Sequence, residues 1–524
     1  MRVLLVEPNY RRNSGSTIKR VVSDRSRKDD ESLWYPPLGL MKLATFHRKR
    51  EEEVSFVYGC NRDFAKQGAV FALYWDRIYI TTLFTYEWKH TIETIKFYNN
   101  LLGGDKSRIF VGGIMASLIP DEIHRETGIY PVTGVLSSPQ QIGLDGDENI
   151  DLLPPDYRIV DNRLYAINDT FYAYTSRGCV NDCGWCGVPK MEPGGIHYID
   201  IKETIRELRR LYGDKPRLKL MDNNALACTE FRRIVDDLLE LGYGKENLTA
   251  TKPRKRRVVD FNQGLDATYL TEENMRLLAQ LNISPMRIAF DRITEKEDYI
   301  RAIRLAKEYG VRNFSNYMLY NFHDTPKDLY ERLMTNVKLN QKFRNRRNKS
   351  RASIYSFPMR YAPIDNTINP THLSQGNDIG TEWLSNPQSQ NMLHNAFWTR
   401  RFIRNVEVMK GVAHGVISPT PSLAKRTIGE TYEKFIANLY MPEELLRFRN
   451  KYERKVHSLE PGRKPGTGDV EEFRKFILNL LQKGGGRLVK FHNVVSKNSK
   501  EEIRKFLANC DDDEIKKWLQ FYLK

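Results

Sequence analysis

Three cysteines lie close together in the middle of the chain, at Cys179, Cys183 and Cys186. Their spacing is C-x3-C-x2-C, and they make up half of the six cysteines in 524 residues. Thiolates are the usual protein ligands of a 4Fe–4S cluster, which offers four irons. Three ligands on one short loop leave one iron free to bind a small molecule through an amine and a carboxylate. The spacing therefore predicts a 4Fe–4S cluster with one open iron.

Other uses of these cysteines fit the spacing less well. A structural zinc site usually takes four ligands in two pairs, and no second pair lies nearby in the sequence. A disulfide framework is not expected in a long chain with so few cysteines. Cys60, Cys228 and Cys510 are isolated, so we expect each to be a buried or incidental thiol.

The motif also has an aromatic residue, Trp185, directly before its last cysteine. In this it resembles the signature of the radical S-adenosylmethionine (radical SAM) superfamily. The resemblance implies that the open iron chelates the methionine part of SAM. One electron from the cluster would then split SAM into methionine and a 5′-deoxyadenosyl radical, which abstracts hydrogen from an unreactive carbon. It also implies an electron donor of the flavodoxin or ferredoxin type as a partner.

The length and composition of the chain indicate the kind of protein in which such a site would lie. A chain of this length, 40% hydrophobic, is expected to form more than one domain. It has no apolar run of about 18 residues, so we expect no membrane span. Residues 1–8 read as a first strand and not as a signal peptide. We therefore expect a cytoplasmic protein, in the host cytoplasm if it is phage-encoded.

The formal net charge of +17 favours attraction to phosphate backbones. Two basic runs, 252–257 and 342–351, each precede an expected strand. They would therefore lie at the end of a sheet opposite the chemistry. Each is either a solvated loop or a contact to the phosphates of a long polynucleotide.

Residues 1–160 predict an α/β domain with a doubly wound, Rossmann-like parallel sheet. It resembles the cobalamin-binding-like N-terminal domain of one large branch of the superfamily. Shared features are the Pro-Pro-Leu-Gly-Leu stretch 36–40, the strand end 81–85 and the pair Gly112-Gly113. The Asp-x-His-x-x-Gly motif that ligates cobalt is absent, so binding of cobalamin stays open. Strands are expected at 2–6, 54–58, 76–84 and 108–113, with helices at 41–50 and 89–102.

After a proline-rich linker at 151–157, residues 168–360 predict six strand–helix units, which in this family form an open (β/α)6 radical SAM barrel. The cysteines would then follow the first strand, at the C-terminal end where barrel chemistry takes place. Strands are expected at 171–176, 217–222, 258–266, 286–291, 316–321 and 352–358.

Polar residues at the strand ends are the candidate SAM contacts, and the resemblance assigns their roles. The carbonyl of Trp185 would face the adenine, and Asp222 and Asn223 would meet the SAM amino group, although the usual Gly-Gly-Glu is missing there. Each candidate has an alternative role as a cap of the following helix. Gln263 and Asp266 close the third strand, and Asp291 stands where many relatives hold the ribose hydroxyls.

The C-terminal third has no counterpart in the resemblance. Residues 361–460 predict an irregular and helical extension, and 470–524 a small basic helical unit, joined by a Pro/Gly linker at 460–466. The last unit would hold helices at 471–481, 500–509 and 513–523. The glycine-rich stretch 483–487 reads as a turn and lacks the pattern of a phosphate-binding loop.

The substrate is not encoded legibly. Charge and basic runs favour a nucleic acid, DNA or RNA, with a base extruded to reach the barrel mouth. The enzyme would then be an isomerase or another modifier of a base, for example a modified thymine, similar to phage DNA-hypermodification radical SAM isomerases. One alternative is a cobalamin-dependent methyltransferase or a cyclase acting on a small metabolite or peptide. Another is a non-catalytic iron–sulfur protein that binds nucleic acid. The sequence predicts no catalytic residue beyond the cofactors, and no oligomeric state.

Overall fold

A computed structural model describes residues 1–10, 33–67, 69–250, 252–344, 351–364, 396–413, 415–457 and 468–523. These residues divide into two compact units. The first contains the described residues of Met1–Gln263, Arg276–Ser284 and Ala362–Asn377. The second contains those of Gly264–Met275, Pro285–Tyr361 and Asp378–Lys524.

The first unit begins with a four-stranded parallel sheet of order β2-β1-β3-β4. Its central strand β1 is apolar on both faces, and Val3 to Val6 are fully buried, as expected for a strand covered on both sides. The order reverses between β1 and β3, so the ligand crevice of such a sheet lies at the C-terminal ends of these two strands. The strands are β1 (Arg2–Glu7), β2 (Glu53–Tyr58), β3 (Arg77–Thr82) and β4 (Ile109–Gly113).

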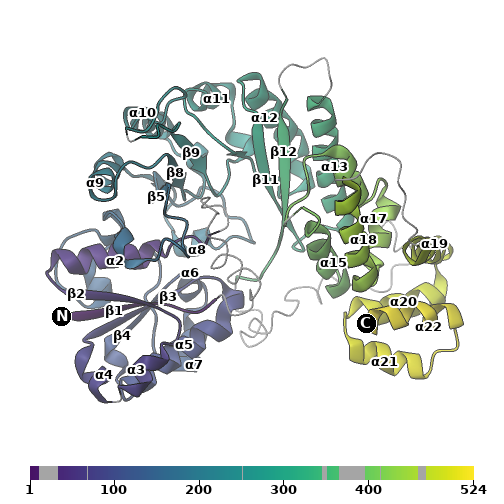
Figure 1. Ribbon diagram of the computed structural model, residues 1–524, viewed down its shortest axis with the longest axis horizontal. Coiled ribbons are helices and arrows are strands. Elements are labelled where there is room, and N and C mark those ends of the chain that lie inside the picture. The colour runs from purple at the N-terminus through teal and green to yellow at the C-terminus, as the bar shows by residue number, and fades with distance from the viewer. Residues whose placement is uncertain are drawn as a thin grey trace. The chain divides into compact units, whose positions relative to one another are not determined.

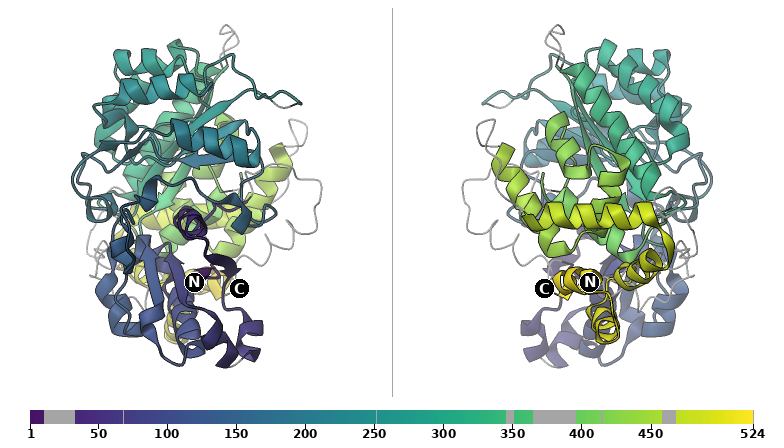
Figure 2. Two further views of the ribbon diagram at one scale, coloured as in Figure 1. Left: turned by 90° about the vertical axis from the view of Figure 1, so that its left-hand side faces the viewer. Right: turned by 90° about the vertical axis from the view of Figure 1, so that its right-hand side faces the viewer.

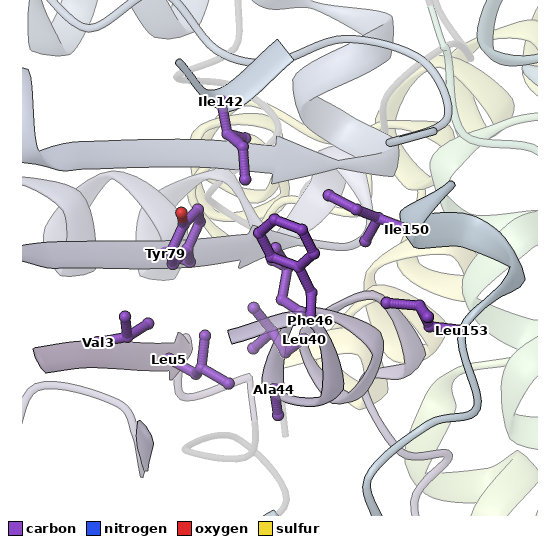
Figure 3. Close-up of a cluster of buried hydrophobic side chains, with 10 residues drawn as sticks. Val3, Leu5, Leu40, Ala44, Phe46, Tyr79, Ile142, Ile150 and Leu153 are labelled. Atoms are coloured by element: carbon purple, nitrogen blue, oxygen red, sulfur yellow. The ribbon is translucent and has the colours of Figure 1, made fainter. Parts of the chain in front are cut away.

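Helices cover both faces of this sheet, with α2 on one side and α5 and α7 on the other (Figure 1). The face under α2 is the hydrophobic core shown in Figure 3, where Val3 and Leu5 of β1 meet Leu40 and Phe46 of α2. The helices are α2 (Leu38–Lys49), α3 (Arg62–Lys66), α4 (Ala69–Tyr74), α5 (Trp88–Leu101), α6 (Ile114–Leu118) and α7 (Pro120–Thr127).

The stretch expected to be a linker packs along α2. Leu153 is buried in the same core. The Asp156 amide donates to the Met41 carbonyl at 3.0 Å, and the Thr45 hydroxyl donates to the Pro154 carbonyl at 2.6 Å. Residues 153–156 therefore pack against the first unit, and the expected domain boundary at 160 stays a prediction.

The first unit also holds a three-stranded parallel sheet of order β5-β8-β9. Leu218 and Leu220 of the middle strand are fully buried. Two amphipathic helices, α9 and α10, bury leucine and isoleucine side chains beside it. The elements are β5 (Thr170–Ala173), α9 (Lys202–Tyr212), β8 (Arg217–Leu220), α10 (Phe231–Glu240) and β9 (Val258–Phe261).

The second unit has its own three-stranded parallel sheet, of order β10-β11-β12. Its long helix α13 begins with Thr325 as N-cap, Pro326 in the first turn and Asp328 completing a capping box, so its start is encoded locally. The elements are β10 (Met286–Arg287), α12 (Lys296–Glu308), β11 (Asn313–Tyr320), α13 (Pro326–Phe343) and β12 (Ser353–Arg360), while α11 (Glu272–Leu278) follows β9 in the chain.

These results confirm the α/β class and the parallel strands. Each of the six expected barrel strands has a counterpart, but they form two separate three-stranded sheets, one in each unit. The third and fourth strands are shorter than expected: β9 ends at Phe261, and beyond it Leu265 makes a single bridge to Ile288. A single six-stranded barrel stays a prediction.

The C-terminal third of the described chain is mostly helical (Figure 2). Helix α20 was not expected, because Gly485 and Gly486 form its first turn and only Gly484 separates it from α19. Among the described residues, no helix has both the length and the apolar character needed to cross a bilayer. The helices are α15 (Arg400–Lys410), α16 (Pro421–Ile428), α17 (Tyr432–Tyr440), α18 (Glu443–His457), α19 (Gly468–Lys483), α20 (Gly485–Ser496), α21 (Lys500–Ala508) and α22 (Asp513–Leu523).

Several predictions fall on residues that the structure does not describe. These are most of the irregular segment 361–390, the linker 460–466, and residues 345–350 of the second basic run.

Candidate functional site

A short antiparallel ribbon closes the cysteine loop at its base. Strand β6 (Ser176–Arg177) pairs with β7 (His197–Tyr198), and the Ile199 amide donates to the Thr175 carbonyl at 2.8 Å. The ribbon directly follows β5, so residues 178–196 form a closed loop at the C-terminal end of that strand. This is the strand end at which the sequence predicts the chemistry.

Two glycines allow the backbones at the two ends of the loop to approach each other closely. Gly178 has φ +85°, and a Cβ atom there would lie 1.8 Å from the carbonyl oxygen of Gly195. Gly195 itself has φ +86°. An L side chain at position 178 would therefore be strained and would push the base of the loop open.

The cysteine sulfurs lie within reach of nitrogen donors. The Asn181 amide lies 3.4 Å from the Cys179 sulfur and the Val188 amide 3.5 Å from the Cys186 sulfur. The side-chain nitrogen of Asn224 is 3.9 Å from the Cys179 sulfur. None of these three cysteines forms a disulfide, and all three are partly exposed. Such donors stabilise thiolate over thiol and tune a bound cluster.

The donor set fits a 4Fe–4S cluster. Within the described chain, no three His, Cys, Asp or Glu side chains converge on one metal ion. A cubic cluster does not need such convergence, because each thiolate binds a different iron. Three accessible thiols on one glycine-closed loop match three irons of a cube and leave the fourth without a protein ligand.

Helix α6 of the N-terminal domain contacts this loop from one side. Helix α6 follows β4 directly, and α8 (Val188–Met191) lies within the cysteine loop. A Cβ atom on Gly187 would lie 2.8 Å from a Leu118 methyl group, and the Lys190 ammonium donates to the Leu118 carbonyl. The helix that directly follows β4 of the N-terminal sheet is therefore packed against the cysteine loop.

Asp222, expected at the SAM amino group, is bound to the strand that leads into the cysteine loop. Its Oδ1 accepts from the hydroxyls of Thr175 at 2.6 Å and Ser176 at 2.8 Å, and its Oδ2 accepts from the Thr175 amide at 3.2 Å. Burial raises the pKa of Asp222, and these hydrogen bonds partly offset the rise. The carboxylate therefore fixes the approach to the loop, and its contact with SAM stays a prediction.

Asn223 and Glu192 meet at the same end of β8. The Asn223 side-chain nitrogen donates to Glu192 Oε2 at 2.9 Å, and the Gly178 amide donates to the same oxygen at 2.6 Å. Glu192 Oε1 accepts from Arg177 at 2.9 Å. One carboxylate thus joins both ends of the cysteine loop to β8.

The ion pairing continues to helix α2. Arg177 donates to both oxygens of Asp151, at 2.6 and 3.0 Å, and Lys42 lies 2.7 Å from Asp151 Oδ1. Burial alone would raise the pKa of Asp151, but Lys42 and Arg177 together hold it below its usual value. Glu192 was not predicted from the sequence, although opposite charges at 177 and 192 flank the cysteines and are a local sign of pairing.

Two other candidates, Trp185 and Gln263, are at least partly exposed. Trp185 is partly exposed in the turn between Cys183 and Cys186, where the Cys186 amide donates to the Cys183 carbonyl at 2.8 Å. Gln263 is exposed just beyond β9. Both belong to the first unit, as do the cysteines, and their roles toward SAM stay predictions.

Asp266 and Asp291 belong to the second unit. Asp266 caps a short 3-10 turn, accepting from the Thr268 amide at 3.0 Å and hydroxyl at 2.6 Å, as the alternative capping role predicts. Asp291 Oδ1 accepts from the Leu319 amide at 2.8 Å, and burial raises the pKa of its carboxyl group. Whether either meets SAM stays a prediction.

A buried arginine that the sequence did not mark holds the strand ends around Asp291. Arg332 on α13 is fully buried and donates to the carbonyls of Phe290, Asp291 and Leu319 at 2.7–3.0 Å. It also donates to Asp324 at 2.7 Å. Burial raises the pKa of Asp324 to about 6, although Arg332 opposes the shift.

The described basic run is partly paired within the first unit. Arg257 lies 2.6 Å from Asp214, and Arg256 lies 3.7 Å from Glu246. Arg257 is thus largely buried and not part of a solvated loop, and contact of residues 252–257 with nucleic acid stays a prediction.

No protein-family model matches the chain, and no curated protein sequence matches it. Two similar solved structures are each 14% identical to it. One is the cobalamin-dependent S-adenosylmethionine radical enzyme OxsB in its apo form, matched over 99% of this chain and 83% of that chain with a TM-score of 0.48. The other is Streptococcus suis SuiB bound to precursor peptide SuiA, matched over 52% of this chain and 56% of that chain with a TM-score of 0.26. A radical SAM enzyme is thus among the solved structures to which this chain is similar.

Proposed function

We propose that this protein is a radical SAM enzyme that cleaves S-adenosylmethionine at a 4Fe–4S cluster held by Cys179, Cys183 and Cys186. The observation that carries the proposal is the closed loop itself. It presents three accessible thiols with nitrogen donors beside two of the sulfurs, at the C-terminal end of a parallel strand.

Different residues of the chain would have different roles around such a cluster. The three thiols supply the ligands, and nearby N–H groups stabilise their anionic form. Asp222 orders residues 175–176, and Glu192 joins Gly178 to Asn223, so the loop is held before any cofactor binds. When bound, the cluster and SAM supply a one-electron reduction that yields a 5′-deoxyadenosyl radical, with the electron coming from a flavodoxin- or ferredoxin-type donor.

For the substrate we propose a nucleic acid base, and for the reaction an isomerisation or other remodelling of that base, as on a modified thymine in DNA. The net charge of +17 supports a polyanionic partner. A base within a duplex would have to be extruded to reach the cluster.

A second candidate is a cobalamin-dependent methyltransferase or cyclase acting on a metabolite or peptide. The observation that favours it is the contact between Leu118 and Gly187, because Leu118 ends α6, the helix that follows the C-terminal end of β4 in a doubly wound sheet, where such sheets bind ligands. Titration of the protein with hydroxocobalamin, followed by its visible spectrum after gel filtration, tests this candidate. Retention of about one equivalent would favour methyl transfer, and its loss during filtration would count against it.

The cluster assignment is tested by replacing Cys179, Cys183 or Cys186 with alanine and reconstituting the protein anaerobically with iron and sulfide. Each replacement should abolish the brown 4Fe–4S spectrum, whereas Cys60→Ala, at a partly exposed thiol outside the loop, should leave it unchanged. An intact spectrum in any of the three loop variants would refute the assignment.

The reaction is tested by incubating the reconstituted protein anaerobically with dithionite, SAM and either DNA or RNA. Mass spectrometry should detect 5′-deoxyadenosine together with an altered nucleoside. If 5′-deoxyadenosine forms but every nucleoside is unchanged, and binding to polynucleotides is weak and insensitive to salt, the nucleic acid substrate is wrong while the radical chemistry stands.

A further inference from the structure

A chain of four buried charges runs from helix α2 to the cysteine loop. Its members alternate in sign: Lys42, Asp151, Arg177 and Glu192, joined by contacts of 2.6–2.9 Å. Their side chains are only 10–17% exposed. Two positive and two negative charges cancel, so the chain as a whole adds no net charge beside the cysteines.

The last member, Glu192, lies near the C-terminal end of the loop and binds the N-terminal end. Glu192 lies at the end of α8 and accepts from the Gly178 amide, next to Cys179, as well as from Asn223 at the end of β8. Arg177 is also fixed from a second side, because its guanidinium lies 3.4 Å from the centre of the Tyr174 ring. Glu192 therefore helps to fix Cys179 relative to β8, together with Asp222.

The first member, Lys42, belongs to the N-terminal sheet domain. It donates to the carbonyl as well as the carboxylate of Asp151, at 2.5 and 2.7 Å, and lies 5.4 Å from the Tyr174 ring centre. The ion chain thus connects α2 to the cysteine loop through Asp151, in the stretch 151–157 that was expected to be a linker. An uncompensated charge at any point would be left in a poorly hydrated setting, where its field is weakly screened.

We propose that Glu192 is a positioning residue for the cluster, and that the Lys42–Asp151–Arg177–Glu192 chain sets both the geometry and the reduction potential of the cysteine loop. This rests on the proposed cluster. Removing the negative charge of Glu192 should favour the reduced, more negative cluster and raise its potential. Removing the positive charge of Lys42 should lower the potential. If these residues only held the loop in place, the two substitutions would not shift the reduction potential in opposite directions.

The test compares Glu192→Gln and Lys42→Met with wild type, using Glu148→Gln as the matched control, because Glu148 pairs with Lys49 at the surface of the same unit. Reduction potentials are measured on the reconstituted full-length proteins, together with the rate at which a chelator removes the iron. We expect a higher potential in E192Q, a lower one in K42M and no shift in E148Q. Loss of iron from E192Q should be about tenfold faster, the usual effect of removing an outer-shell partner.

The proposal is overturned if E192Q behaves as E148Q does, or if E192Q and K42M move the potential in the same direction. If the K42M variant has the same reduction potential as wild type, Lys42 does not influence the cluster, and the role proposed for α2 is overturned.

A second measurement does not depend on the cluster. Hydrogen exchange on the full-length protein before reconstitution should show the amides of residues 177–199 exchanging about tenfold faster in E192Q than in E148Q, because the Gly178 amide loses an anionic acceptor. If wild type binds no cluster, the proposed function fails, and this measurement alone decides whether Glu192 holds the loop. Equal exchange in the two variants would show that it does not.

Discussion

Two carboxylates at the ends of parallel strands, Asp222 in the first unit and Asp291 in the second, look alike in the sequence but are used differently. Asp222 has both oxygens occupied by donors from Thr175 and Ser176. Asp291 shows one hydrogen bond to its carboxylate within the described chain, from the Leu319 amide to Oδ1. The first is saturated by the protein, and the second keeps acceptor capacity for an outside donor such as a hydroxyl group.

The two strand ends are also stabilised by different means. At Asp222, a buried anion is matched by hydroxyls and one amide. Near Asp291, a fully buried cation, Arg332, binds backbone carbonyls and the carboxylate of Asp324. The difference shows that a polar strand-end residue is informative about ligand binding only after the donors that the protein itself supplies have been counted.

The largest effect is expected from Arg332→Met, which removes the cation from the second unit. Three carbonyls and Asp324 would lose their donor, so we expect a loss of about 3–5 kcal/mol in the free energy of unfolding. Urea denaturation followed by tryptophan fluorescence measures this loss, and one of the seven tryptophans, Trp398, lies at the site, where its indole donates to Asp324 at 3.2 Å. Arg304→Met, at an exposed position of α12, should cost less than about 0.5 kcal/mol. Equal effects of the two changes would contradict the central role of Arg332.

Asp222→Ala should have the next largest effect, because it leaves three buried donors of Thr175 and Ser176 without their acceptor. The expected loss is about 2–4 kcal/mol. It is measured by chemical denaturation of the protein before reconstitution, so that the cluster does not contribute. Asp161→Ala removes a carboxylate at the surface of the same unit and serves as the control. If the two variants were equally stable, Asp222 would be free for SAM, and the contrast with Asp291 would disappear.

Asp324, unlike Arg332 and Asp222, should make the stability of the second unit depend on pH. Its pKa is about 6 when folded, against an ordinary value of 3.8, so the folded state holds the proton more tightly. The stability that this group contributes is therefore greatest below pH 4 and falls as the pH rises through 6, by about 2–3 kcal/mol. Asp324→Asn removes this titration. The difference in unfolding free energy between wild type and variant should thus change by that amount between pH 4 and 7, and a constant difference would exclude the raised pKa.

The sequence predicted what local patterns encode. The start of α13 follows from Thr325, Pro326 and Asp328, and the cysteine spacing identifies the candidate site, because both depend on residues a few positions apart. Glu192 has partners 14 and 31 positions away, and Arg332 has one 42 positions away, so one basic residue among 83 could not be singled out. Helix α20 was missed because a run of glycines normally argues against helix, whereas here the run supplies a tight corner and the first turn.

Asp291→Asn should change stability least and still reveal the purpose of that carboxylate. The amide oxygen can keep the hydrogen bond from the Leu319 amide, so we expect the unfolding free energy to stay within about 1 kcal/mol of wild type. If the carboxylate holds SAM hydroxyls, its neutral replacement should weaken SAM binding to the reconstituted protein about tenfold, or ~1.4 kcal/mol. Calorimetric titration measures this affinity, and Asp298→Asn, at a half-exposed carboxylate on α12, is the matched control. Unchanged SAM affinity would remove Asp291 from the site, whereas a stability loss as large as that of Asp222→Ala would show that both carboxylates serve the fold alone.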